Sequence, residues 1–374
     1  MSILTKQIAM PKLAAPRLRK PATGAKAAKP PRGKSVVTGL EIGATQVIAA
    51  QARSENGQIV AERVVARQLP HGLMRDGLVI ESALLATELK QLFAEHRLSK
   101  RVRVGLATPR TVLRVIDLPP LEDKDIRPAL LMQAQERIPM PLDSAVIDYQ
   151  AVGLVDTPDG QRLRVVVVAT EREGVDRLLD TLRRAGLKPE GIDLSIFAAI
   201  RALRVDRVHG PVLYAQLGDL VNIAIAEAGV CRFTRQAPQG LALVLERLAE
   251  SRAISVDEAY ALIQRAAVAH PGAADDAESH DVADVLRRLA AELGSELRAA
   301  AEFYSNQFGS GVVIAGVIAG PLALLPGFAE ALSAASGLEL TCGEAVPADA
   351  DGLGDVDGRL AVVASGLAVG VVGP

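Results

Sequence analysis

The sequence predicts an α/β protein with two lobes, each a mixed sheet flanked by helices. Hydrophobic residues make up 49% of the chain and aromatic residues only 3%, so the cores must be built from Ala, Val, Leu and Ile, as in layered strands and helices. At 374 residues the chain exceeds the usual size of one domain. Strand and helix patterns alternate, and a three-strand meander near the N-terminus recurs in the second half, which indicates two related lobes.

The first 35 residues differ in composition from the rest of the chain. They contain many basic residues and no acidic one before Glu41, and Ala and Pro fill much of the remainder. Such a segment cannot bury enough apolar surface to offset its ordering entropy, so we expect a disordered, solvated tail over 1–35. The alternative is an electrostatic tether to anionic lipid or to an acidic partner. The basic residues are Lys6, Lys12, Arg17, Arg19, Lys20, Lys26, Lys29, Arg32 and Lys34.

Local signals place the elements of the first half of the chain. Asn56-Gly57 predicts a hairpin, because both residues tolerate positive φ. Ser82 is predicted to N-cap a helix over 83–96. Pro139 and Pro141 are expected to stop a helix that runs from 122 to 137. The remaining expected elements are three strands within 36–69, strands at 101–108, 111–118 and 162–170, a helix at 171–187 that Gly186 closes, and a strand-to-helix unit at 192–203.

The second half repeats the opening pattern and then becomes mainly helical. Turn signals at Gly218-Asp219 and Gly229 divide 211–237 into a second three-strand meander. The segment 311–329 carries no charge, but its glycines and prolines would break a membrane-spanning helix, so we expect a buried strand, a turn and a helix there. The other expected elements are helices at 241–264, 282–308 and 360–369, and a loop at 270–280.

Composition also excludes classes of function. The net charge of −2 excludes a globally basic nucleic-acid-binding protein and leaves a local basic patch as the alternative. The two cysteines, Cys231 and Cys342, have no paired spacing and no nearby His, which argues against a disulfide framework or a zinc site. We therefore expect a soluble protein of a reducing compartment, with no nucleic acid among its partners.

The stretch 118–149, LPPLEDKDIRPALLMQAQERIPMPLDSAVIDY, resembles the most diagnostic part of the type IV pilus assembly protein PilM family. Further stretches, at 165–203 and 289–308, are similar to the family's "AGL-x-P" turn with its helices and to its long helix ending in Phe-Tyr. The resemblance covers roughly 36–370. Within the diagnostic stretch the matching residues are Leu118, Pro119, Glu136, Ile138, Pro139, Pro141, Asp148 and Tyr149.

The resemblance implies an actin-like (ASKHA) fold, with an inserted 1C-type subdomain as in the cell-division protein FtsA. We accordingly expect four parts in the chain. The basic tail takes 1–35, lobe 1 takes 36–108 and 164–206, the inserted subdomain takes 109–163, and lobe 2 takes 207–374.

The resemblance also implies a nucleotide site between the lobes, for ATP with Mg²⁺. In the first turn, Glu41 replaces the family's Asp, and in the second turn Gln216 replaces another Asp, so one carboxylate is lost. Asp219 follows Gly218, on the wrong side of that glycine to replace it. Pro321 removes a backbone donor after Gly320, and Ile48 and Ile263 stand where the family carries Lys. The residues that the resemblance assigns to the nucleotide are Glu41, Gly43, Ala44, Thr45, Gln216, Gly218 and Gly320.

Because phosphoryl transfer depends on positioning and charge, these departures predict weak or vestigial ATP binding and no useful hydrolysis. The glycines are also explained by ordinary tight turns. Competing functions are an actin-like ATPase that retains activity through Glu41 and Thr45, a small-molecule kinase of this fold, and a cytoplasmic component of a type II secretion-like system.

The resemblance favours a scaffold at the inner face of the cytoplasmic membrane. Its implied partner is the short cytoplasmic N-terminal peptide of a PilN-type single-span protein, with other components of the pilus platform as further partners. The peptide would dock between lobe 1 and the inserted subdomain, near Ile138, Pro139, Pro141 and Tyr149. Pro139 and Pro141 are also explained as a helix stop, and Tyr149 as a core strand residue.

Overall fold

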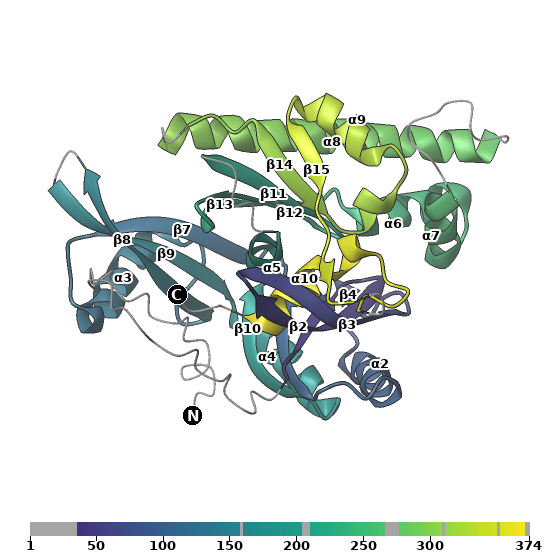
Figure 1. Ribbon diagram of the computed structural model, residues 1–374, viewed down its shortest axis with the longest axis horizontal. Helices are drawn as coiled ribbons and strands as arrows, with labels where there is room; N and C mark the ends of the chain where they lie inside the picture. Colours follow the sequence, from purple (N-terminus) through teal and green to yellow (C-terminus); the bar gives the residue numbers. More distant parts are fainter. Residues whose placement is uncertain are drawn as a thin grey trace, which may run out of the picture.

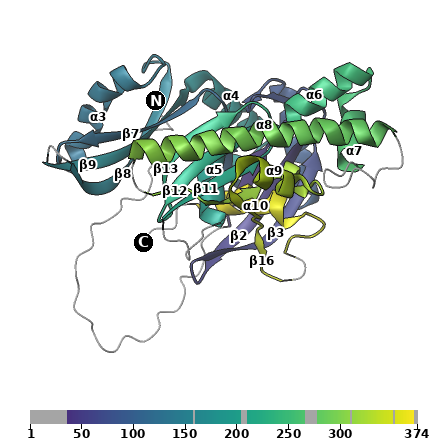
Figure 2. The same cartoon turned by 90° about the horizontal axis from the view of Figure 1, so that it is seen from above.

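The computed structural model describes residues 36–157, 160–203, 210–265, 277–308, 311–349 and 352–370. The predicted basic tail, 1–35, lies outside the described residues. Two large sheets lie one above the other in Figure 1, and a smaller sheet projects to one side of them. The long helix α8 (Ala277–Phe308) lies on the outer side of lobe 2, the upper lobe in Figure 1, and Figure 2 shows it along its length.

Lobe 1 is built on a six-stranded sheet, and one face of this sheet packs against two helices. The Asn56-Gly57 hairpin is confirmed, with φ of 50° and 83° at the two residues. The helices α2 (Ser82–Glu95) and α4 (Arg172–Arg184) cover one face with apolar residues at helical spacing. The sheet order is β10 (Lys188–Leu194), β6 (Arg101–Leu106), β1 (Thr38–Ile42), β2 (Gln46–Glu55), β3 (Gln58–Gln68) and β16 (Val346–Pro347), and the short strands β4 (Met74–Arg75) and β5 (Leu78–Val79) form a separate hairpin.

Ser82 does not cap α2 as predicted. It is the first helical residue, Glu81 occupies the cap position without a side-chain cap, and the Ser82 hydroxyl lies 2.8 Å from Thr181 Oγ1 on α4. The Ser82 hydroxyl therefore links α2 to α4 instead of capping the N-terminus of α2.

The inserted subdomain is a three-stranded antiparallel sheet with one helix. Its order is β7 (Thr111–Leu118), β9 (Gly160–Glu171) and β8 (Ala145–Thr157), and α3 (Asp123–Arg137) covers one face. The strand predicted at 162–170 belongs to this sheet and not to lobe 1, so the expected boundary at 163/164 cuts through β9. Strand β9 is covered on both faces. Val165 and Val167 face α3, whereas Val166 and Val168 face the interface between the lobes. Its continuous run of valines therefore resembles a strand in the interior of a large sheet.

Lobe 2 is a five-stranded sheet covered by helices. The helix predicted over 241–264 is two helices, because Ala253 adopts a left-handed conformation and Ser255 and Glu258 then form a reciprocal capping box. The long helix begins at Ala277, before the predicted residue 282, and 266–276 lie outside the described residues. The elements are β13 (Val230–Ala237), β12 (Val221–Glu227), β11 (Pro211–Leu217), β14 (Ala315–Ala319) and β15 (Glu339–Cys342) in sheet order, with α6 (Leu241–Arg252), α7 (Val256–Arg265), η1 (Pro321–Leu324) and α9 (Phe328–Ser336).

The end of the chain returns to lobe 1, although 207–374 was expected to form lobe 2 throughout. Strand β16 pairs with β3, and α10 (Gly358–Val369) packs on β1, β2 and α5 (Ser195–Ala202). The two helices α5 and α10 thus lie where the two lobes meet (Figure 1), and their side chains share one core with β11 and β14.

The uncharged segment forms the predicted strand, turn and helix as β14, η1 and α9. In the part of the chain that the structure describes, none of the helices combines the length and the apolar character needed to cross a bilayer.

Candidate functional site

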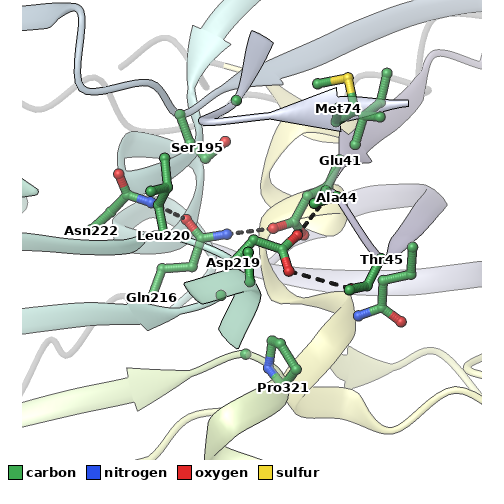
Figure 3. A pocket seen from close by; sticks show the side chains of 18 of the residues that line it. Glu41, Ala44, Thr45, Met74, Ser195, Gln216, Asp219, Leu220, Asn222 and Pro321 are labelled. Carbon is green, nitrogen blue, oxygen red and sulfur yellow. Dashed lines mark hydrogen bonds between the residues drawn. The ribbon is translucent and has the colours of Figure 1, made fainter. Parts of the chain in front are cut away.

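A cavity of about 230 Å³ lies between the lobes, and all seven residues predicted for the nucleotide line it. The turn between β1 and β2 forms one wall, the turn between β11 and β12 the opposite wall, and Pro321 the floor (Figure 3). The fold brings these turns together because β1 and β11 are central strands of their sheets, and the turn that follows each of them lines the cavity. The seven residues are Glu41, Gly43, Ala44, Thr45, Gln216, Gly218 and Gly320.

The first turn is bonded to a carboxylate from the other lobe. Gly43 N donates to Gln46 O over 2.8 Å, which closes the turn. Ala44 N then donates to Asp219 Oδ2 over 2.5 Å, and Thr45 Oγ1 donates to Asp219 Oδ1 over 3.3 Å (Figure 3). The turn after β11 directs the Asp219 carboxylate into the cleft, where it bonds to the first turn and does not take the place of the carboxylate lost at 216.

A chain of side-chain amides leads from lobe 2 to Glu41. Gln236 Nε2 donates to Asn222 Oδ1 over 2.8 Å, Asn222 Nδ2 donates to Gln216 Oε1 over 3.2 Å, and Gln216 Nε2 donates to Glu41 Oε1. Gln216 and Asn222 are only 8% and 4% exposed. Sequence reasoning missed Asn222 and Gln236, and the polar residues at inward positions of apolar strands were the signal that could have identified them.

Two carboxylates therefore share the cleft. Burial, and then the charge of Asp219, raises the pKa of Glu41 to about 8, against the opposing hydrogen bond from Gln216. Burial also raises the pKa of Asp219, although its bonds to Ala44 and Thr45 act in the opposite direction. Glu41 is consequently mostly protonated near neutral pH, a state that accepts a hydrogen bond but attracts a cation weakly.

The residues present do not fit an ATP-hydrolysing site with Mg²⁺. Asp219 uses the backbone donor of Ala44 that a phosphate would need, Gln216 supplies no carboxylate, and Pro321 begins η1 without an N–H. Ile48 and Ile263 are buried in apolar cores, at 3% and 1% exposed. Within the described ranges, no group of three His, Cys, Asp or Glu residues is arranged to hold a metal ion.

The shifted pKa of Glu41 predicts a pH-dependent stability. A carboxyl whose pKa rises from 4.5 to about 8 on folding stabilises the fold fully below pH 4.5 and loses that contribution as the pH rises through 8. Glu41→Gln keeps an acceptor for Gln216 and removes the titration. Relative to the unmodified chain, this variant should gain at least about 1 kcal/mol of unfolding free energy between about pH 5 and pH 9, after allowance for solvent screening. Urea unfolding at both pH values measures the gain, and parallel pH profiles for the two proteins would contradict it.

The residues predicted for a partner do not all reach the surface. Ile138 is 5% exposed and packs in the core of the small sheet, so it is a packing residue and not a contact. Pro139 and Pro141 are exposed just after α3, and Tyr149 is half-buried against that core. Beside Tyr149, the Asp148 Oδ2 atom is buried and has no hydrogen-bond partner among the described residues, and burial raises the pKa of Asp148 to about 6.

Comparison with known proteins agrees with this architecture. The solved PilM-PilN type IV pilus biogenesis complex matches with a TM-score of 0.76 and 26% identity, over 90% of this chain and 98% of that chain. The ethanolamine utilization protein EutJ from Carboxydothermus hydrogenoformans has a TM-score of 0.54 and 17% identity, over 91% of both chains. MreB5 of Spiroplasma citri bound to AMPPNP has a TM-score of 0.51 and 10% identity, over 89% of this chain and 95% of that chain.

These three likenesses confirm the predicted actin-like fold. At 17% and 10% identity, EutJ and MreB5 show similarity of fold and nothing further. The sequence model of the family described as type IV pilus assembly protein PilM matches residues 39–345. The chain belongs to the type IV pilus assembly protein PilM family.

Proposed function

We propose that this protein is a cytoplasmic scaffold of a type IV pilus assembly machine that binds the cytoplasmic N-terminal peptide of a PilN-type inner-membrane protein. The observation that carries the proposal is the likeness to the PilM-PilN complex along nearly the whole of both chains, at 26% identity. The direct test is titration of that peptide into the protein, with micromolar binding as the expected result.

The peptide site that we propose lies between lobe 1 and the small sheet. Helix α4 of lobe 1 packs against β8 and β9 there, and Asp193 of lobe 1 lies close enough to Asp148 to raise its pKa. Pro139 and Pro141 offer exposed apolar surface, and on the face of β8 opposite Tyr149 the buried Asp148 Oδ2 has no hydrogen-bond partner among the described residues. An extended peptide supplies backbone N–H donors and apolar side chains, which complement these features. Tyr149 would contact the peptide from the edge of this site.

Nucleotide chemistry is a minor part of the proposed function. We expect purified protein to hydrolyse ATP no faster than a matched blank, because the cleft presents the Gln216 amide and a largely protonated Glu41 where hydrolysis needs ionised carboxylates. A colorimetric phosphate assay measures this. A turnover above the blank that disappears in Glu41→Ala would contradict the expectation and favour the ATPase alternative.

We further propose a position on the inner face of the cytoplasmic membrane. Besides the PilN-type partner, other platform components would be recruited there, and the basic segment 1–35 would bind anionic lipid. Vesicle binding that falls as salt rises, and that requires residues 1–34, is the property expected of such a segment.

A further inference from the structure

We propose that the Asp219 carboxylate is a built-in occupant of the first turn of the cleft, where it takes the hydrogen-bond donors that an anionic ligand would need. The chain's own side chains would then hold the two lobes together across the cleft, with no nucleotide between them. This inference goes beyond the scaffold function and does not depend on which peptide binds.

The donors that Asp219 uses are those of an anion-binding turn. Backbone N–H groups and hydroxyls in such turns bind phosphate oxygens, and they bind carboxylate oxygens in the same way. Ala44 N donates to one oxygen of Asp219 over 2.5 Å, and Thr45 Oγ1 donates to the other over 3.3 Å. Both carboxylate oxygens are therefore engaged, and Figure 3 shows them directed at the turn from the opposite wall.

The carboxylate is held in place by the backbone behind it. Leu241 N, at the start of α6, donates to Gly218 O over 2.9 Å. A Cβ on Gly240 would lie only 2.1 Å from the Asp219 carbonyl oxygen, so the two backbones are in direct contact. The backbone that carries the Asp219 side chain is therefore bonded to and packed against the start of α6.

The first turn is shaped to accept this carboxylate. A Cβ on Gly43 would lie 2.4 Å from Asp219 Oδ2, so only glycine at 43 lets the turn approach so closely. Gly43 has no positive φ to explain it otherwise. An incoming phosphate would need the same space and the same donor, so Asp219 must move away before an anion can bind there.

A second bond across the cleft lies beside the first. Gln216 of lobe 2 donates to Glu41 of lobe 1, and Asn222 fixes the Gln216 amide from behind over 3.2 Å. Lobe 1 thus contributes two donors and the Glu41 acceptor to the contact, and lobe 2 contributes the Gln216 donor and the Asp219 carboxylate as acceptor. Such paired contacts hold the lobes in one relative position, which suits a protein that presents a constant docking surface.

The test compares two variants that each remove one acidic residue from the same cavity. Asp219→Ala vacates the first turn, whereas Glu246→Gln removes a charge from the wall that α6 forms. We expect Asp219→Ala to bind MgATP at least about tenfold more tightly than the unmodified chain, and Glu246→Gln to bind it as the unmodified chain does. Isothermal titration calorimetry with MgATP measures all three proteins.

Equal tightening in both variants would overturn the proposal, because it would assign the effect to charge repulsion in the cavity. No tightening in Asp219→Ala, with an unchanged circular dichroism spectrum, would also overturn it. If that variant fails to fold, hydrogen exchange on the unmodified, ligand-free chain decides the matter. The Ala44 amide should be protected from exchange, and rapid exchange there would show that Asp219 does not occupy the turn.

Discussion

Gly39→Ala should cost about 3 kcal/mol or more of the unfolding free energy, although it adds a single methyl group. Gly39 lies in β1 where α10 crosses the sheet, and a Cβ there would lie 1.9 Å from Ala364 O and 2.5 Å from Ala368 N. Both atoms belong to the helix backbone, so no side-chain rotation can relieve the overlap. The helix must move away from the sheet, and the core that it shares with α5 must open.

The matched control is Gly191→Ala in β10 of the same sheet. A Cβ at Gly191 meets only the Arg103 side chain, at 3.7 Å, which is an ordinary contact. Its cost should stay within about 1 kcal/mol. Urea unfolding monitored by circular dichroism compares the two variants, and similar midpoints for both would show that α10 does not approach β1 as closely as described.

Local sequence signals predicted most elements but not how distant ones associate. The Asn56-Gly57 hairpin and the strand, turn and helix at 315–336 form as expected because turn chemistry and periodicity act over a few residues. The placement of β9 depends on its pairing with β7 and β8. The placement of α10 depends on Gly39 in β1, which lies far from α10 in the sequence. No local pattern carries such information.

In the candidate site, too, local motifs were predicted correctly and contacts between distant residues were missed. Family motifs identified both turns, and the fold brings them into one cavity. The amide chain was missed because it depends on strand register, in which Gln216 lies opposite Asn222 and Asn222 lies opposite Gln236. The bonds of Asp219 to Ala44 and Thr45 were missed because they join turns that lie 174 and 175 residues apart in the sequence. In both cases the chemistry arises from residues that meet only in the folded chain.

Removal of the small sheet should abolish binding of the PilN-type peptide. The deletion must follow the observed sheet and remove 111–170, since a cut at 163 would leave 164–171 of β9 without its partner strands. The chain can be rejoined there because Arg110 and Glu171 form an ion pair at 2.5 Å and Thr111 lies opposite Thr170. A short glycine linker therefore spans the gap without strain on lobe 1.

Calorimetric titration of the synthetic cytoplasmic peptide into the full chain tests the scaffold account most directly. Buried apolar anchors contribute about 1.5–3 kcal/mol each, and ordering a flexible peptide offsets much of that gain, so a Kd in the micromolar range is expected. The chain lacking 111–170 and a scrambled peptide should give no saturable heat. No binding to the folded full chain at several hundred micromolar peptide would contradict the scaffold account, and equal binding to the shortened chain would contradict the proposed groove.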